Sequence, residues 1–87
     1  MMAELHRLKT LLESCFGDAD DEQGLATLQQ QLSIYPEDMA EFQADLDEVL
    51  PDPVVCQSLL ENYAHRYLDP QASRDWLHWL KGASTAP

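Results

Sequence analysis

The stretch YPEDMAEFQADLDEVLPD, residues 35–52, combines the pattern of an amphipathic helix with seven carboxylates and no cation. Pro36 favours the start of a helix because its fixed φ suits the first helical position and it has no N–H to leave unpaired. On a helical wheel the apolar side chains fall on one arc of about 100°. These residues, which we expect to face a core, are Met39, Phe42, Leu46, Val49 and Leu50.

The carboxylates of this helix fall on a second arc of about 100°, beside the apolar one. This acidic stripe consists of Glu37, Asp38, Glu41, Asp45 and Glu48, whereas Asp47 lies off it. Like charges three or four residues apart destabilise a helix by about 0.2–0.5 kcal/mol per pair. No lysine or arginine is interleaved, so we expect the acidic stripe to need a cationic partner surface.

Helices are predicted on both sides of this segment. Leucines spaced three and four apart predict a helix over about residues 3–16 that stops at Gly17, and another over about residues 21–33. The acidic run at residues 18–22 is placed to cap the second of these helices. Asp52-Pro53 and Asp69-Pro70 each predict an aspartate N-cap followed by proline at the first helical position.

The last predicted helix runs from Pro70 to a glycine stop at Gly82. We expect at least one of Trp76 and Trp79 to pack in the core, and the role of the other as an exposed interface anchor stays open. No segment alternates apolar and polar residues long enough to predict a strand. The predicted fold is all-α, a compact bundle of four to five short helices over residues 1–82, with a disordered tail at 83–87.

The charge is unevenly distributed along the 87 residues, whose net charge is −11. Residues 10–64 hold 13 Asp or Glu and no Lys, Arg or His, whereas the two ends hold three acids and five Lys or Arg. Such a field repels nucleic acid and anionic membranes and attracts cationic proteins. The N-terminus lacks the apolar region of a secretory signal, and no apolar run approaches about 20 residues. We therefore expect a cytoplasmic protein.

No residue pattern indicates catalysis or metal binding. Cys15 and Cys56 fit no metal or redox spacing and are expected to be buried thiols. A calcium loop that starts at Asp18 would need Gly at its sixth position and Glu at its twelfth, where Gln23 and Gln29 stand. The three histidines are not at ligand spacing from one another or from a cysteine. We expect a protein that is not an enzyme and holds neither metal nor cofactor.

Several short signatures occur in a recognisable order from about Leu5 to Leu80. They are Leu8-x-x-Leu-Leu-x-x-Cys15-Phe16 followed by the acidic turn, then Asp47-Glu48-Val49-Leu50, then Leu59-Leu60-x-x-Tyr63, and Asp75-Trp76-Leu77-x-Trp79-Leu80 at the end. In this order the chain resembles the small all-helical immunity proteins of bacterial contact-dependent growth inhibition systems. Cys15 stands where that family often has the first residue of an aromatic pair.

The resemblance implies a cytoplasmic immunity protein that binds and neutralises one cognate toxin C-terminal domain, commonly a nuclease, as a monomer in a 1:1 complex. Nuclease active sites are cationic because they hold phosphates. The central partner-binding residues are expected to be those of the acidic stripe: Glu37, Asp38, Glu41, Asp45 and Glu48. Second choices are Asp18, Asp20, Asp21, Glu22 and Asp52.

Two other functions are compatible with part of the pattern. An acidic nucleic-acid mimic that blocks a DNA- or RNA-binding protein would carry a similar charge distribution. A helical adaptor would present an apolar groove rather than an acidic stripe.

Overall fold

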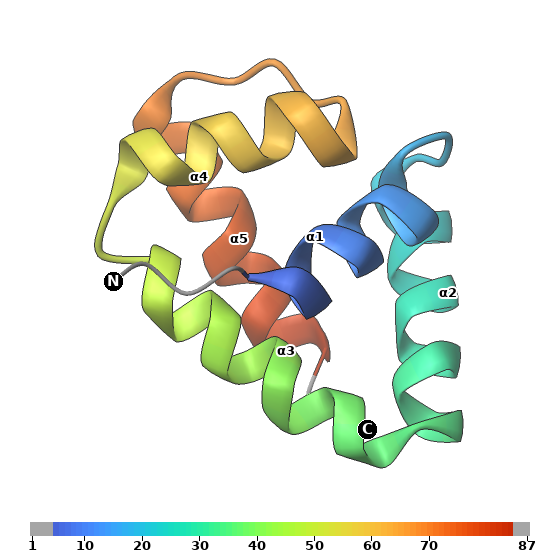
Figure 1. Ribbon diagram of the computed structural model, residues 1–87. Coiled ribbons are helices and arrows are strands. Elements are labelled where there is room, and N and C mark those ends of the chain that lie inside the picture. Colours follow the sequence, from blue (N-terminus) through green and yellow to red (C-terminus); the bar gives the residue numbers. More distant parts are fainter. Residues whose placement is uncertain (1–4, 85–87) are drawn as a thin grey trace.

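The computed structural model describes residues 5–84, which form helices and no strand (Figure 1). The first helix is α1 (His6–Leu11), which continues as a π-helical segment η1 (Leu12–Phe16). It is followed by α2 (Asp21–Ile34) and α3 (Pro36–Val49). Next come α4 (Pro53–Leu59), which continues as π-helical η2 (Leu60–Ala64), and α5 (Pro70–Ser84). The predicted all-α bundle of short helices is confirmed.

Aspartate caps begin three of these helices, as the sequence predicts. Asp20 accepts a hydrogen bond from the Gln23 amide at 2.8 Å at the start of α2. Asp52 accepts one from the Val54 amide at 3.2 Å at the start of α4, and Asp69 accepts one at 2.7 Å at the start of α5. Each carboxylate satisfies an amide that has no partner within its helix, which stabilises the fold by about 0.5–2 kcal/mol.

The C-terminal helix continues past its predicted end. Gly82 lies inside α5, which runs to Ser84, so the predicted stop at Gly82 and the start of a disordered tail at residue 83 are wrong. The Ser84 side chain is buried and its hydroxyl accepts a hydrogen bond from Gln43 Nε2 at 3.0 Å. This contact with α3 favours the helix more than glycine disfavours it. The rest of the predicted tail, 85–87, lies outside the described residues, as does the start predicted at residue 3.

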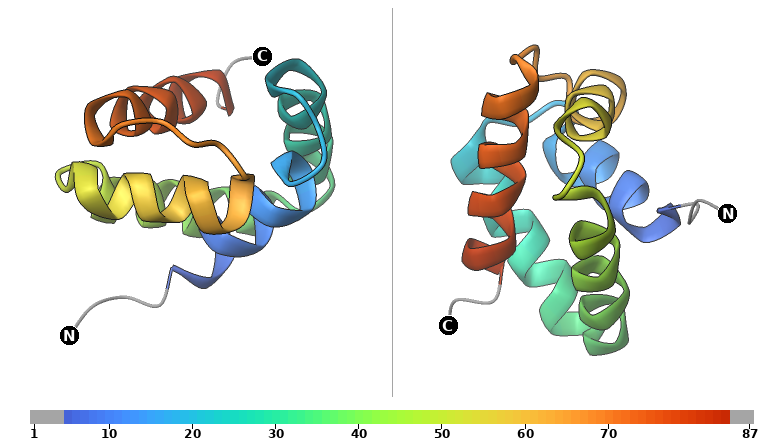
Figure 2. Two further views of the ribbon diagram at one scale, coloured as in Figure 1. Left: turned by 90° about the horizontal axis from the view of Figure 1, so that it is seen from above. Right: turned by 90° about the vertical axis from the view of Figure 1, so that its left-hand side faces the viewer.

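The helices pack as a small layered bundle (Figures 1 and 2). α1 lies against α3, η1 packs against both α2 and η2, and α4 packs against α5. No helix within residues 5–84 combines the length and the apolar character needed to cross a membrane.

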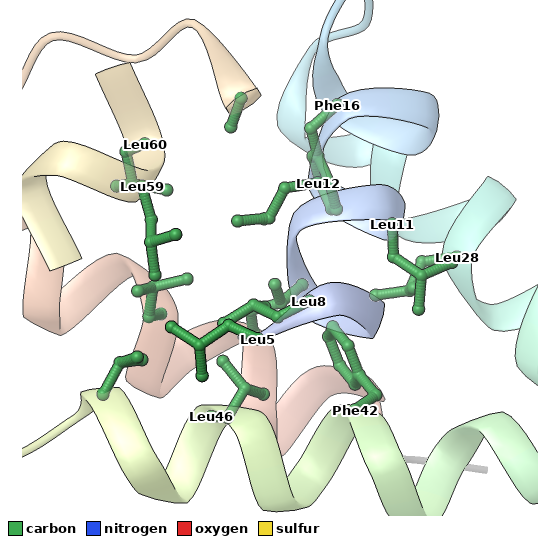
Figure 3. Close-up of a cluster of buried hydrophobic side chains, with 14 of the residues drawn as sticks. Leu5, Leu8, Leu11, Leu12, Phe16, Leu28, Phe42, Leu46, Leu59 and Leu60 are labelled. Carbon is green, nitrogen blue, oxygen red and sulfur yellow. The ribbon is translucent and has the colours of Figure 1, made fainter. Parts of the chain in front are cut away.

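The apolar face of α3 forms one wall of the core. Phe42 and Leu46 have no exposed surface, and Figure 3 shows them facing Leu5 and Leu8 of the N-terminal segment. Burial of each such side chain contributes about 1.5–3 kcal/mol. The buried apolar residues are Leu5, Leu8, Leu11, Leu12, Cys15, Phe16, Leu28, Leu32, Phe42, Leu46, Val49, Leu50, Cys56, Leu59, Leu60, Ala64, Leu77 and Leu80.

Gly24 permits a close approach between η1 and α2. A Cβ atom at this position would lie 2.2 Å from Cδ1 of the buried Phe16 ring, well inside van der Waals contact. Phe16 also packs edge-on against Trp76 of α5, with ring centroids 5.0 Å apart. Since the ring is held from both sides, it has little room to move away from a larger residue at 24.

Gly24→Ala is expected to lower the free energy of unfolding by about 1–3 kcal/mol, because overpacking outweighs the better helix propensity of alanine. Gly82→Ala is the matched control, since a Cβ there meets nothing within 4 Å. The control should leave stability unchanged or raise it by up to about 1 kcal/mol. Urea unfolding of both variants checks this, and equal effects at the two positions would contradict the packing role of Gly24.

Candidate functional site

The acidic stripe lies along α3, as predicted, but its five carboxylates are in different surroundings. Glu37, Glu41 and Glu48 are exposed, whereas Asp38 and Asp45 are partly covered. The Asp38 side chain retains only 13% of its accessible surface. The cover comes from α1, which crosses this side of α3 (Figure 1).

Arg7 of α1 supplies the stripe with a cation from within the chain. Its Nη2 lies 3.4 Å from Asp38 Oδ1, and its Nε lies 3.4 Å from Glu41 Oε2. Glu41 is exposed, and an ion pair to an exposed carboxylate stabilises a fold by at most about 1 kcal/mol. Glu41 therefore has a cation beside it within the chain, Arg7, which is 34 residues away in sequence, and its contact with a partner stays a prediction.

Asp45 has a structural partner. Its Oδ2 accepts a hydrogen bond from the backbone N–H of Leu8 at 3.0 Å. Leu8 is in the first turn of α1, where the amides have no partners within the helix, and Leu5 at the N-cap provides no side-chain hydrogen bond. Asp45 thus caps α1 from the neighbouring helix, and its charge also favours the positive end of that helix. This hydrogen bond gives Asp45 a role within the fold, and its contact with a partner stays a prediction.

Asp47 lies off the acidic stripe, as the helical wheel predicts. Its carboxylate forms an ion pair with the Lys81 ammonium group of α5. Together with Arg7, this pair brings cations from both ends of the chain against α3. Glu37 and Glu48 form no ion pair within residues 5–84 and are the stripe members left for other contacts.

The second-choice carboxylates have mixed roles. Asp20 and Asp52 are helix N-caps, and Asp21 forms an ion pair with Arg66. Asp18 and Glu22 are exposed. These roles leave Asp18 and Glu22 as the second-choice residues whose carboxylates are least engaged within the described part of the chain.

The structure does not gather the two sets into one site. The turn that carries Asp18 precedes α2, whereas the acidic stripe begins after the far end of α2 (Figure 1). The 14 residues of α2 span about 21 Å. Asp52 lies beyond the opposite end of α3 from Glu37. The partner-binding role of all these carboxylates stays a prediction, and α3 is the most compact candidate surface.

Arg66 is an organising residue that no local sequence pattern predicts. Its Nη1 donates hydrogen bonds to the carbonyl oxygens of Phe16 at 2.6 Å and Ala64 at 2.5 Å, which are the last residues of η1 and η2. Its Nη2 donates to Ala19 O at 2.8 Å, and Nε and Nη2 contact Asp21 Oδ1 at 3.0 and 2.8 Å. One sequence signal was available: Arg66 is the first Lys or Arg after Lys9.

The thiols and the acidic turn give no sign of reaction chemistry. Burial raises the pKa of both Cys15 and Cys56, so both thiols stay protonated near neutral pH and are poor nucleophiles. Within residues 5–84 no three His, Cys, Asp or Glu side chains are arranged to hold a metal ion. What distinguishes α3 is its row of exposed carboxylates at Glu37, Glu41 and Glu48.

Asp45→Ala is expected to lower the free energy of unfolding by about 0.5–2 kcal/mol through loss of the α1 cap. Glu48→Ala is the control and should change stability by less than about 0.5 kcal/mol, since it is exposed. Thermal and urea unfolding measure both. If the two variants are equally stable, the capping role of Asp45 is wrong.

Arg66→Lys is expected to lower the free energy of unfolding by about 1.5–3 kcal/mol. A lysine ammonium group cannot reproduce the planar guanidinium, which donates to three carbonyl oxygens and a carboxylate. Arg74→Lys is the control: Arg74 Nε donates one hydrogen bond, to Leu50 O at 2.8 Å. A lysine can retain a single hydrogen bond of this kind, so we expect Arg74→Lys to lower the free energy of unfolding by less than about 1 kcal/mol. Urea unfolding compares the two, and a similar loss at both positions would contradict the role assigned to Arg66.

Comparison of the chain with models of known protein families, with curated proteins and with solved structures finds no match.

Proposed function

We propose that this protein is an immunity protein that binds and neutralises a cationic toxin domain of a contact-dependent growth inhibition system, through the exposed side of α3. The observation that carries the proposal is the row of exposed carboxylates at Glu37, Glu41 and Glu48, which extends over about 16 Å of helix. Arg7 is the one cation that contacts this row in the described chain, and it lies at 3.4 Å from Glu41.

The electrostatics favour a basic protein as the partner. With a net charge of −11, the chain accelerates encounter with cationic surfaces and disfavours nucleic acid. A nuclease domain has a cationic cleft because it must hold phosphates. Carboxylates placed along such a cleft would occupy the positions of those phosphates and exclude the substrate.

The stripe residues then divide by role. Glu37 and Glu48 would contact basic side chains of the toxin directly, and Glu41 would exchange its long contact with Arg7 for a shorter one. Asp38 and Asp45 would hold α1 in place rather than meet the partner. Removal of the exposed charges of Glu37 and Glu48 is expected to slow association and to weaken its dependence on salt.

The test uses the purified C-terminal domain encoded by the gene directly upstream, the position in which the toxin of such a system is expected. Glu37→Gln/Glu48→Gln should weaken binding by about tenfold or more at low ionic strength and by less at high ionic strength. The control is Glu13→Gln/Glu61→Gln, which removes the same charge from exposed positions outside α3.

Two outcomes would count against the proposal. If the two double variants lose the same affinity, binding depends on the net charge of the chain and not on a site on α3. Absence of binding by the wild-type protein, or binding that leaves the activity of the upstream domain intact, would contradict the immunity function itself.

A further inference from the structure

Two large apolar side chains are exposed next to each other at the corner between α2 and α3. Ile34, the last residue of α2, is 59% exposed, and Tyr35, the residue between the helices, is 46% exposed. The other exposed large apolar residues in the part of the chain that the structure describes are dispersed: Val54, Tyr67 and Trp79. The corner is thus the one place in residues 5–84 where two such side chains are consecutive.

The corner projects from the bundle. In Figure 1 α2 and α3 meet at the lower right, away from α4, and Figure 2 shows the same corner at the edge of the molecule. Exposed apolar side chains on a convex surface lose water contact when they enter a concave partner surface. The shape therefore suits insertion into a cleft more than contact with another convex surface.

Carboxylates of the acidic stripe lie beside these side chains. Two peptide units join Tyr35 to Glu37, so their Cα atoms are at most about 7.6 Å apart. Glu41 follows one helical turn later, and both glutamates are exposed. An aromatic anchor bordered by charge has the composition of an interface centre with its polar rim.

We propose that this α2–α3 corner anchors the partner contact: Ile34 and Tyr35 enter an apolar pocket within a cationic cleft of a partner protein, and Glu37 and Glu41 pair with basic side chains at the rim of that pocket. The proposal rests on the function proposed above and specifies its central contact.

The charge around the corner favours a basic protein as the partner over a second copy of the chain, nucleic acid or a membrane. A second copy of the chain would bring the same carboxylates and a net charge of −11 to the contact, and like charges at an interface oppose association. Nucleic acid and anionic membranes are repelled for the same reason. A basic protein is the partner whose charge complements the corner.

The experiment measures binding of the purified upstream-encoded C-terminal domain by surface plasmon resonance at low and high ionic strength. Tyr35→Ser is paired with Tyr67→Ser, and Ile34→Gln is paired with Val54→Gln. Tyr67 and Val54 are more exposed than the residues they are paired with, at 76% and 65%, and lie outside the corner. Serine is a favourable N-cap residue, so Tyr35→Ser retains a suitable start for α3. Circular dichroism verifies that helix content is unchanged.

Tyr35→Ser and Ile34→Gln should each raise Kd by about tenfold or more, mainly through faster dissociation, and the two control variants by less than about threefold. The salt dependence of Kd should stay as in the wild type for these apolar changes, and should weaken in Glu37→Gln.

If the wild-type protein binds but both corner variants stay within about threefold of it, the anchor is overturned and the proposed function stands. The anchor is also overturned if the control variants lose as much affinity as the corner variants. If the wild-type protein does not bind the domain even at low ionic strength, the proposed function fails and the anchor fails with it.

Discussion

The guanidinium of Arg66 joins segments that are otherwise held together by apolar packing. Its hydrogen bonds reach the carbonyl ends of η1 and η2 and the turn that precedes α2. The guanidinium carbon also lies 5.4 Å from the centroid of the Phe16 ring, which fills the space left by Gly24. Because η1 is continuous with α1, the same interaction holds the C-terminal end of the helix whose N-terminal part lies against α3.

The charge distribution of the sequence has two consequences in the fold. Cations near the two ends of the sequence form ion pairs with carboxylates of its acidic middle: Arg7 pairs with Asp38, and Lys81 pairs with Asp47. Part of the anionic charge on α3 is therefore neutralised within the chain. Asp45 caps the N-terminus of α1 by accepting a hydrogen bond from the Leu8 amide. The exposed carboxylates of α3 that form no ion pair within residues 5–84 are Glu37 and Glu48, near its two ends, and Glu41 has only a long contact with Arg7. Under the proposed function, different members of one stripe would stabilise the fold and bind the partner.

Local patterns predicted most of the fold, and long-range contacts account for what they missed. The helical wheel placed Phe42 and Leu46 in the core, and aspartates before proline predicted two of the caps, because these signals lie within one helix. The bonds of Arg66 to Phe16, Ala19 and Asp21 and the Ser84 contact that extends α5 join residues 41–50 positions apart. The sequence could likewise show five carboxylates on one arc, but it could not show which of them α1 would cover.

The connection between α2 and α3 is a single residue, Tyr35, followed by Pro36. Proline fixes φ at about −65°, and both helices are anchored in the core through Leu32 and Phe42. The backbone of the corner therefore has few conformations to lose when it is immobilised by another molecule. Association at this point would carry a small entropic penalty, and the free and bound corner should superpose closely, as in rigid-body recognition.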